Sequence, residues 1–329
     1  MTAKSESLRL VLRDEMPPDW RRVTPLLELT PLFAELRAHL ADGNGVDACR
    51  LFHGRGHCFP GFESLVVDWF APVALVTLFD EKPEPWLGEL VGELERALGD
   101  ALGGVLVQRR HLGGTPTETV RGSLPEQCWA REAGLSYRLR LGAGQNIGFF
   151  GDMGPTRAKV RELAGGRKVL NLFAYTCSFS VAAVAGGASS VVNVDMSRAA
   201  LEVGRRNHLD NGQDPRLASF LAHDLFNSFG KLRRLGPYGV VVIDPPTNQG
   251  KSFAANRDWA KLLRQVPSLA APGADVFAAL NGPWLGATFL TDLVAEHLPA
   301  ATLVEQFDGG PNYPECGAEA GLKVLHLRV

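Results

Sequence analysis

The chain has 329 residues, of which 45% are hydrophobic and 21% charged, and its formal net charge is -2. This length exceeds the usual size of a single-core domain and predicts two domains, or one domain with a sizeable extension. The composition excludes a largely disordered chain, and the small net charge means that any contact with nucleic acid depends on a local basic patch.

The cysteines and the apolar runs predict the cellular compartment of the protein. The cysteines are odd in number and form no C-x-x-C pair, which argues against a disulfide framework and favours a reducing cytoplasm. The polar first residues contain no signal-peptide core, and no apolar run reaches transmembrane length, so we expect no contact with a membrane. The five cysteines are Cys49, Cys58, Cys128, Cys177 and Cys316.

Two segments precede the larger part of the chain. Residues 1–44 are predicted to form an arm and one helix, because leucines recur at helical spacing over Thr24–Leu40 before a Gly-Asn-Gly stop. Residues 45–154 are predicted to form a small α+β domain. Its expected elements are two strands within Phe62–Phe79, a helix over Trp86–Leu98, and strands over Val105–Arg110 and Ser136–Leu141.

From residue 155 to residue 329, short apolar runs alternate with amphipathic segments of helical length. This alternation predicts an α/β domain with a doubly wound, Rossmann-like sheet. The turn-rich stretch before the last apolar run leaves no room for a crossover helix, so the last strand should run antiparallel. The seven expected strands are Lys168–Phe173, Ser190–Val194, Leu217–Leu221, Val240–Ile243, Asp275–Leu280, Ala301–Gln306 and Leu322–Arg328.

Ligands of such sheets bind beyond the carboxyl ends of the strands, so the loop after each strand is a candidate site. The first loop, Asn171–Ser178, lacks the G-x-G-x-x-G pattern that lets backbone approach a pyrophosphate, and a dinucleotide therefore fits poorly. Asp195 ends the second strand at the spacing where an acid binds the ribose hydroxyls of an adenosine ligand. The alternative for Asp195 is an N-cap acid or a solvated turn before the helix that starts near Ser197.

The third and fourth loops also carry acids. Asp224 follows the third strand, where its carboxylate can accept from an adenine amino group, with Leu225 and Phe226 packing against the ring. A helix N-cap is again the alternative. The fourth strand runs into a turn whose two prolines fix φ and remove two donors, leaving carbonyls that can accept from an amino group on a base. The predicted catalytic residues are the three of this turn, Asp244, Pro245 and Pro246.

The motifs together resemble the large-subunit ribosomal RNA methyltransferases of the RlmI and RlmK type. The resemblance extends from about Gly54 to the C-terminus and is carried by PGFESLVVDWF, QNIGFFGDM, VLNLFAYTCSFSVAAVAGGASSVVNVDMS, DPP and the closing YPE and GLKVLHLRV. It implies a class I methyltransferase fold and S-adenosyl-L-methionine as the cofactor. The N-terminal RNA-binding PUA domain of RlmI-type proteins is not expected here, since only an arm and one helix precede His53.

The resemblance also implies roles for individual residues. A strap before the sheet is expected to close over the cofactor, the first loop to wrap its methionine part, and the acids after the next strands to hold ribose and adenine. The strap consists of Gln145, Phe149 and Asp152. The remaining cofactor-binding residues are Phe173, Ala174, Tyr175, Thr176, Asp195, Met196, Asp224, Leu225 and Asp244. Arg157, Lys251 and Phe253 are expected to bind the substrate.

Two departures from the family pattern bear on the chemistry. Asn281 occupies the place of the cysteine found in the cytosine-C5 members, whose reaction needs a covalent thiolate adduct. Cys177 belongs to the cofactor loop, where a small thiol is usually packing, and no activating partner of Cys316 is identified. Asn248 replaces the aromatic residue that usually stacks on the target base, a role that Phe253 could take instead.

Four functions follow as hypotheses. The leading one is methylation of a ribosomal RNA base, with large-subunit RNA as partner and a homodimer as a possible assembly. A protein that binds the cofactor or assists ribosome assembly without catalysis is the second, and a methyltransferase of proteins or small molecules is the third. An NAD enzyme is disfavoured because the glycine fingerprint is absent. Zinc binding by His53, His57 and Cys58 is also disfavoured, because no second ligand pair follows, so no metal is expected.

Overall fold

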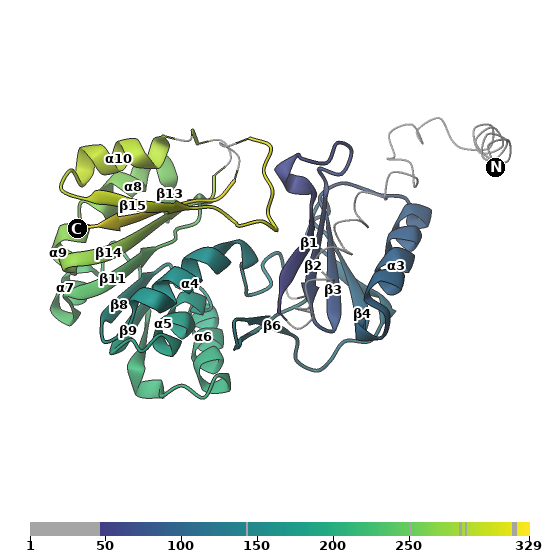
Figure 1. Ribbon diagram of the computed structural model, residues 1–329, viewed down its shortest axis with the longest axis horizontal. Helices are drawn as coiled ribbons and strands as arrows, with labels where there is room; N and C mark the ends of the chain where they lie inside the picture. Colours follow the sequence, from purple (N-terminus) through teal and green to yellow (C-terminus); the bar gives the residue numbers. More distant parts are fainter. Residues whose placement is uncertain (1–46, 143, 251, 283–284, 287, 318–320) are drawn as a thin grey trace.

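The computed structural model describes residues 47–142, 144–250, 252–282, 285–286, 288–317 and 321–329. The helix expected at Thr24–Leu40 and the substrate residue Lys251 lie outside the described residues. Two sheets stand side by side, a five-stranded sheet near the start of the described chain and a seven-stranded sheet formed by the rest (Figure 1).

The five-stranded sheet has the order β1-β2-β3-β4-β5, in which only the β3–β4 pair is parallel, with α3 as the crossover between them. Leucines four residues apart give α3 one apolar stripe, and this stripe covers the sheet face that is turned away from the second sheet (Figure 1). The elements are β1 (Cys49–His53), β2 (Leu65–Phe70), β3 (Val73–Leu78), α3 (Glu84–Leu98), β4 (Gly104–Arg109) and β5 (Thr117–Gly122).

A hairpin formed by β6 (Trp129–Glu132) and β7 (Leu135–Arg138) covers part of the opposite face. Because α3 lies on one face and this hairpin on the other, every residue of β2 and β3 is buried, which explains their unbroken apolar runs. Sequence patterns did not predict β1, β5 or β6. β5 has the sequence Thr-Glu-Thr-Val-Arg-Gly and is an exposed edge strand, so it lacks the alternation of apolar and polar residues that indicates a strand.

The seven-stranded sheet has the order β10-β9-β8-β11-β14-β16-β15. β16 runs antiparallel between β14 and β15, and the other neighbours are parallel. The predicted Rossmann-like sheet with a reversed final strand is therefore confirmed. Its strands are β8 (Lys168–Leu172), β9 (Ser190–Asp195), β10 (Ala218–Ala222), β11 (Tyr238–Ile243), β14 (Ala270–Leu280), β15 (Thr302–Phe307) and β16 (Lys323–Arg328).

Helices cover both faces of this sheet, as right-handed crossovers require (Figure 1). One face packs on α4 (Gly154–Leu163), α5 (Ser178–Ala185) and α6 (Arg198–Asp210). The other face packs on α7 (Phe229–Leu235), α8 (Ala255–Leu263), α9 (Val266–Leu269) and α10 (Phe289–His297). The short strands are β12 (Asn248–Gln249) and β13 (Phe253–Ala254), and the 3-10 turns are Gly54–Gly56, Gly99–Ala101, Gly151–Met153 and Pro215–Leu217.

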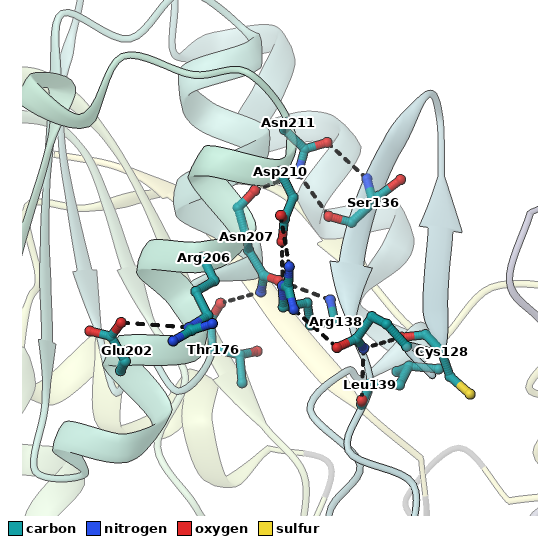
Figure 2. Close-up of polar contacts among 11 residues, drawn as sticks. Cys128, Ser136, Arg138, Leu139, Thr176, Glu202, Arg206, Asn207, Asp210 and Asn211 are labelled. Carbon is teal, nitrogen blue, oxygen red and sulfur yellow. Dashed lines mark hydrogen bonds and ion pairs between the residues drawn. The ribbon is translucent and has the colours of Figure 1, made fainter. Parts of the chain in front are cut away.

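The hairpin also ties the two sheets together. Figure 2 shows that Asn211, at the end of α6, receives the backbone N–H of Ser136 at 2.9 Å and donates its side-chain amide to the Ser136 carbonyl at 2.7 Å. Arg138 of β7 forms an ion pair with Asp210. These contacts fix the hairpin to α6, directly below the loops that end the parallel strands, so the smaller sheet is held beside the candidate site.

Candidate active site

The loops after β8, β9, β10 and β11 meet around a cavity of about 410 Å³. This is the edge where ligands of parallel sheets bind, and the volume lies within the range of roughly 300–1,000 Å³ typical of small-molecule sites. Most of the predicted site residues line this cavity. They are Asp152, Arg157, Phe173, Ala174, Tyr175, Asp195, Met196, Asp224, Leu225, Asp244, Pro245, Pro246 and Phe253.

The loop after β8 has an unusual backbone. Phe173, Tyr175 and Cys177 all adopt left-handed conformations, with φ of 57°, 47° and 63°. Such a conformation costs a residue other than glycine roughly 1–3 kcal/mol and persists where surrounding contacts enforce it. Here the N–H of Tyr175 donates to Asp195 Oδ2 at 2.8 Å, and the N–H of Ala174 donates to the Val194 carbonyl at 3.0 Å. The loop is thus held in one shape before a ligand arrives.

Asn207 of α6 provides a second support for this loop (Figure 2). Its buried side-chain amide donates to the Thr176 carbonyl at 3.0 Å, and its Oδ1 accepts from the backbone N–H of Arg138 at 2.8 Å. The Thr176 hydroxyl donates to the Gly148 carbonyl at 2.6 Å. The structure therefore turns the Thr176 side chain away from the cavity, contrary to the expectation that it faces the cofactor, because its hydroxyl binds the preceding segment.

Asp195 accepts a backbone N–H on each carboxylate oxygen, from Ser197 at 2.7 Å to Oδ1 and from Tyr175 to Oδ2. The N-cap of α6 is Ser197, whose Oγ accepts from the Ala200 N–H at 3.2 Å. The alternative reading of Asp195 as an N-cap is therefore wrong. Each of its oxygens keeps a lone pair for a further donor such as a hydroxyl group.

Asp224 has a similar local role. Its Oδ1 accepts from the Phe226 N–H at 2.8 Å, while Ser228 occupies the N-cap position of α7. The N-cap alternative is thus wrong for Asp224 as well. The buried Leu225 side chain and the Phe226 ring form the apolar part of the cavity next to this acid. An acid beside an apolar wall suits a flat heterocycle that carries an amino group.

Two more carboxylates line the cavity, Asp152 before α4 and Asp244 after β11. Burial raises the pKa of Asp244 to about 7, with the charge of Asp152 adding to the rise and that of Arg157 opposing it. Burial also raises the pKa of Asp152. Two crowded carboxylates that are costly to ionise favour a cationic ligand, because a positive charge between them stabilises their ionised forms.

Arg157, expected to bind the substrate, is committed to the protein itself. Its side chain is 1% exposed, and its Nε and Nη2 each donate to Glu132 at 2.7 Å. Its Nη1 donates to the Phe150 carbonyl at 2.8 Å, and its guanidinium lies 4.4 Å from the Phe149 ring centroid. Arg157 reaches the cavity wall, but its donors hold α4 to the β6–β7 hairpin.

The expected strap is oriented differently from the prediction. Phe149 is buried and stacks on Tyr137 at a centroid distance of 5.0 Å, and the Gln145 carbonyl accepts from Arg110, so neither residue lines the cofactor-sized cavity. Their neighbours Asn146 and Phe150 do line it. Of the predicted strap only Asp152 lines the smaller cavity, together with the residues that follow Gln145 and Phe149.

The Phe253 ring, expected to bind the substrate, and the Cys177 thiol, expected to be packing, are both buried. Phe253 is 1% exposed and packs edge-on against Phe173, with ring centroids 5.3 Å apart, so it forms part of the cavity floor and offers no free face to a base. Cys177 is fully buried, and burial raises the pKa of its thiol well above the ordinary value, which excludes a reactive thiolate. Asn248 is exposed in β12.

No group of three or more histidine, cysteine or acidic side chains within the described residues is placed to hold a metal ion. His53 Nε2 lies 3.2 Å from Glu315 and its Nδ1 lies 2.9 Å from Arg50, so this ring serves a hydrogen-bond network in place of the zinc site considered from sequence. Among the same residues, no helix is long and apolar enough to cross a membrane.

A second, larger cavity of about 1,360 Å³ lies between the two sheets. It shares five lining residues with the first, so the two cavities are adjacent: Asn146, Phe150, Asp152, Thr247 and Asn281. Sequence reasoning missed Asn146, Phe150 and also His223, which lines the first cavity. His223 follows β10 directly, and the rule that sites lie after strand ends could have found it.

The sheet has its reversed strand, β16, next to its edge, acids at the ends of β9 and β10, and an Asp-Pro-Pro turn after β11. Together these features define a class I S-adenosylmethionine-dependent methyltransferase. The comparison with protein families agrees. A model described as S-adenosylmethionine-dependent methyltransferase matches residues 49–328, and the chain belongs to this family. The resemblance and the cofactor expected from the sequence are thereby confirmed.

Individual relatives are similar at modest identity. "Ribosomal RNA large subunit methyltransferase I" of Erwinia tasmaniensis is 27% identical over 293 residues, which cover 85% of this chain and 73% of the relative. "Ribosomal RNA large subunit methyltransferase K" of Neisseria meningitidis is 27% identical, with coverages of 87% and 84%. The crystal structure of SMU.776 complexed with SAH superimposes with a TM-score of 0.82 at 23% identity, covering 93% of this chain and 82% of that one, which supports the fold.

Proposed function

We propose that this methyltransferase modifies a nitrogen of a base in large-subunit ribosomal RNA. The observation that carries the proposal is that the two cavities are adjacent and share five lining residues, since the smaller one has the size of a cofactor site and the larger one has room for a nucleotide. The relatives that are named as ribosomal RNA methyltransferases support this choice of substrate.

The residues of the smaller cavity fit S-adenosylmethionine. Asp195 has free lone pairs for the ribose hydroxyls, and Asp224 with Leu225 offers an acceptor and an apolar wall to the adenine. Asp152 and Asp244 provide negative charge for the cationic part of the cofactor, which supplies an electrophilic methyl group when bound. Burial raises the pKa of both acids, and a cation bound beside them would favour their ionised forms.

The acceptor atom is proposed to be a nitrogen because no cysteine of the described residues lines the smaller cavity, and burial raises the pKa of the Cys49 thiol, which lines the larger one. Methylation at cytosine C5 needs a covalent thiol adduct, whereas Asn281 provides an amide at the junction of the cavities and Cys177 is buried. The Pro245 carbonyl can accept from an N–H of the base. Asp244, with a pKa of about 7, can accept the proton that the nitrogen loses. Most of the rate enhancement then comes from positioning.

Labelled cofactor and ribosomal RNA from a strain that lacks this gene test the proposal. The purified protein should transfer label to large-subunit RNA, and nucleoside mass spectrometry should identify an N-methylated base. Asp244→Asn should lower the rate at least 100-fold, whereas Asp214→Asn, which changes an exposed acid far from both cavities, should not change it. Cofactor binding without label in any ribosomal RNA would contradict the proposal and favour a binding protein without catalysis.

A further inference from the structure

The larger cavity contains two guanidinium groups with no ion-pair partner in the described part of the chain, those of Arg55 and Arg110. Arg55 lies in the 3-10 turn after β1, and Arg110 follows β4 directly. Both lie against the ring of Phe79, with Cζ at 4.4 Å from the ring centroid for Arg55 and 5.4 Å for Arg110. The shared ring holds the two cations near each other on one wall of the cleft.

Arg110 stands at the junction with the cofactor cavity. Its Nη2 donates to the Gln145 carbonyl at 2.7 Å and approaches Asn146 Oδ1 at 3.4 Å, and Asn146 lines both cavities. The Nε of Arg110 is buried and has no partner among the described residues. A buried donor without an acceptor is costly, so a ligand that brings an acceptor to the Arg110 side chain would be favoured.

Two acids of the same cavity already have partners. Asp68 accepts two hydrogen bonds from Arg50, at 2.8 Å and 3.2 Å, and Glu315 binds His53. Burial lowers the pKa of Arg110, and the charges of Arg50 and Arg55 lower it further, with only Asp68 opposing them. The three cations therefore repel one another, and an anion placed between Arg55 and Arg110 would relieve this repulsion.

We propose that Arg55 and Arg110 together bind one phosphate of the substrate strand, next to the nucleotide whose base enters the cofactor cavity. The proposal rests on the RNA substrate proposed above. Guanidinium groups suit this task because their planar donors match two phosphate oxygens at once, and a ring such as Phe79 keeps each plane fixed. Such a contact determines where the strand lies and leaves the base sequence to be read elsewhere.

The test measures binding of a 12-nucleotide single-stranded RNA of mixed sequence by fluorescence anisotropy between 50 and 300 mM NaCl. The variants are Arg55→Ala, Arg110→Ala and the double variant, with Arg109→Ala as the matched control. Arg109 is the neighbour of Arg110, but it is ion-paired with Glu84 and Glu118 and lies outside both cavities. The control therefore removes the same charge from the same strand end without touching the proposed site.

We expect the double variant to bind the RNA at least tenfold more weakly at 50 mM salt. The slope of log affinity against log salt should fall by about 0.7, the value for one lost phosphate contact on a single strand. Arg109→Ala should retain the wild-type affinity and slope. Affinity for S-adenosylhomocysteine, measured by calorimetry, should be unchanged in all variants, which also shows that they fold. The Lys substitutions, Arg55→Lys with Arg110→Lys, should keep the salt slope but lose part of the affinity.

A double variant with the wild-type affinity and salt slope overturns the inference. A titration with inorganic phosphate separates a strand contact from a free-phosphate site, because phosphate binding that depends on the two arginines without any effect on RNA would also overturn it. Failure of the proposed function gives a different result: arginine-dependent RNA binding with no label in ribosomal RNA leaves the phosphate site standing. Labelled RNA with arginine-independent binding leaves the function standing and removes the site.

Discussion

Replacement of Arg157 by methionine tests whether this residue supports the fold or binds the substrate. The change keeps an unbranched apolar stem but removes the guanidinium group and its three hydrogen bonds, two to Glu132 and one to the Phe150 carbonyl. Breaking a fully buried ion pair from one side costs about 3–5 kcal/mol. The Glu132 side chain is 25% exposed, so water compensates part of the loss, and we expect about 2–4 kcal/mol for the whole substitution.

Urea unfolding followed by tryptophan fluorescence measures this loss. Arg216→Ala is the control, because its ion pair with Asp214 is exposed to solvent and its loss should leave the free energy of unfolding nearly unchanged. Adding Glu132→Gln to the Arg157→Met variant should recover part of the stability, since no unpaired charge then remains. A variant with wild-type stability and a KM for RNA raised tenfold would refute this account and restore the substrate role.

Three further substitutions test the site. The pKa of Asp244 is raised in the folded protein, so the free energy of unfolding without cofactor should fall as pH rises from about 4 to about 7, by at most about 4 kcal/mol. Asp244→Asn should abolish this fall, which urea unfolding at pH 5 and pH 8 measures. Asn207→Ala leaves the Thr176 carbonyl and the Arg138 N–H unpaired and should lower the free energy of unfolding by about 2–4 kcal/mol. It should also weaken S-adenosylhomocysteine binding at least tenfold in calorimetry. An unchanged affinity would mean that the loop after β8 holds its shape without Asn207. Cys177→Ala should leave kcat within about twofold, and a loss above 100-fold would reinstate the thiol as a nucleophile.

Local sequence patterns determined most of the methyltransferase sheet. The seven strands were predicted because each is a short apolar run bounded by turn residues, and the reversed strand followed from the missing crossover helix before it. Asp195, Asp224 and Asp244 were found because strand ends of a parallel sheet share one edge. These features depend on residues close together in the sequence, so the spacing of apolar and polar residues is enough to predict them.

Contacts between distant segments decided the rest. Local patterns cannot show that Phe149 turns toward Tyr137, that Thr176 turns toward Gly148 or that the donors of Arg157 are used by Glu132. β5 is an exposed edge strand, so its own residues carry no apolar pattern, and it is a strand because it pairs with β4. The cleft that brings Arg55 and Arg110 to the cofactor cavity exists because the hairpin packs on α6 and the two sheets stand side by side. Sequence determined the groups that end each strand, and tertiary packing decided which of them remain free to meet a ligand.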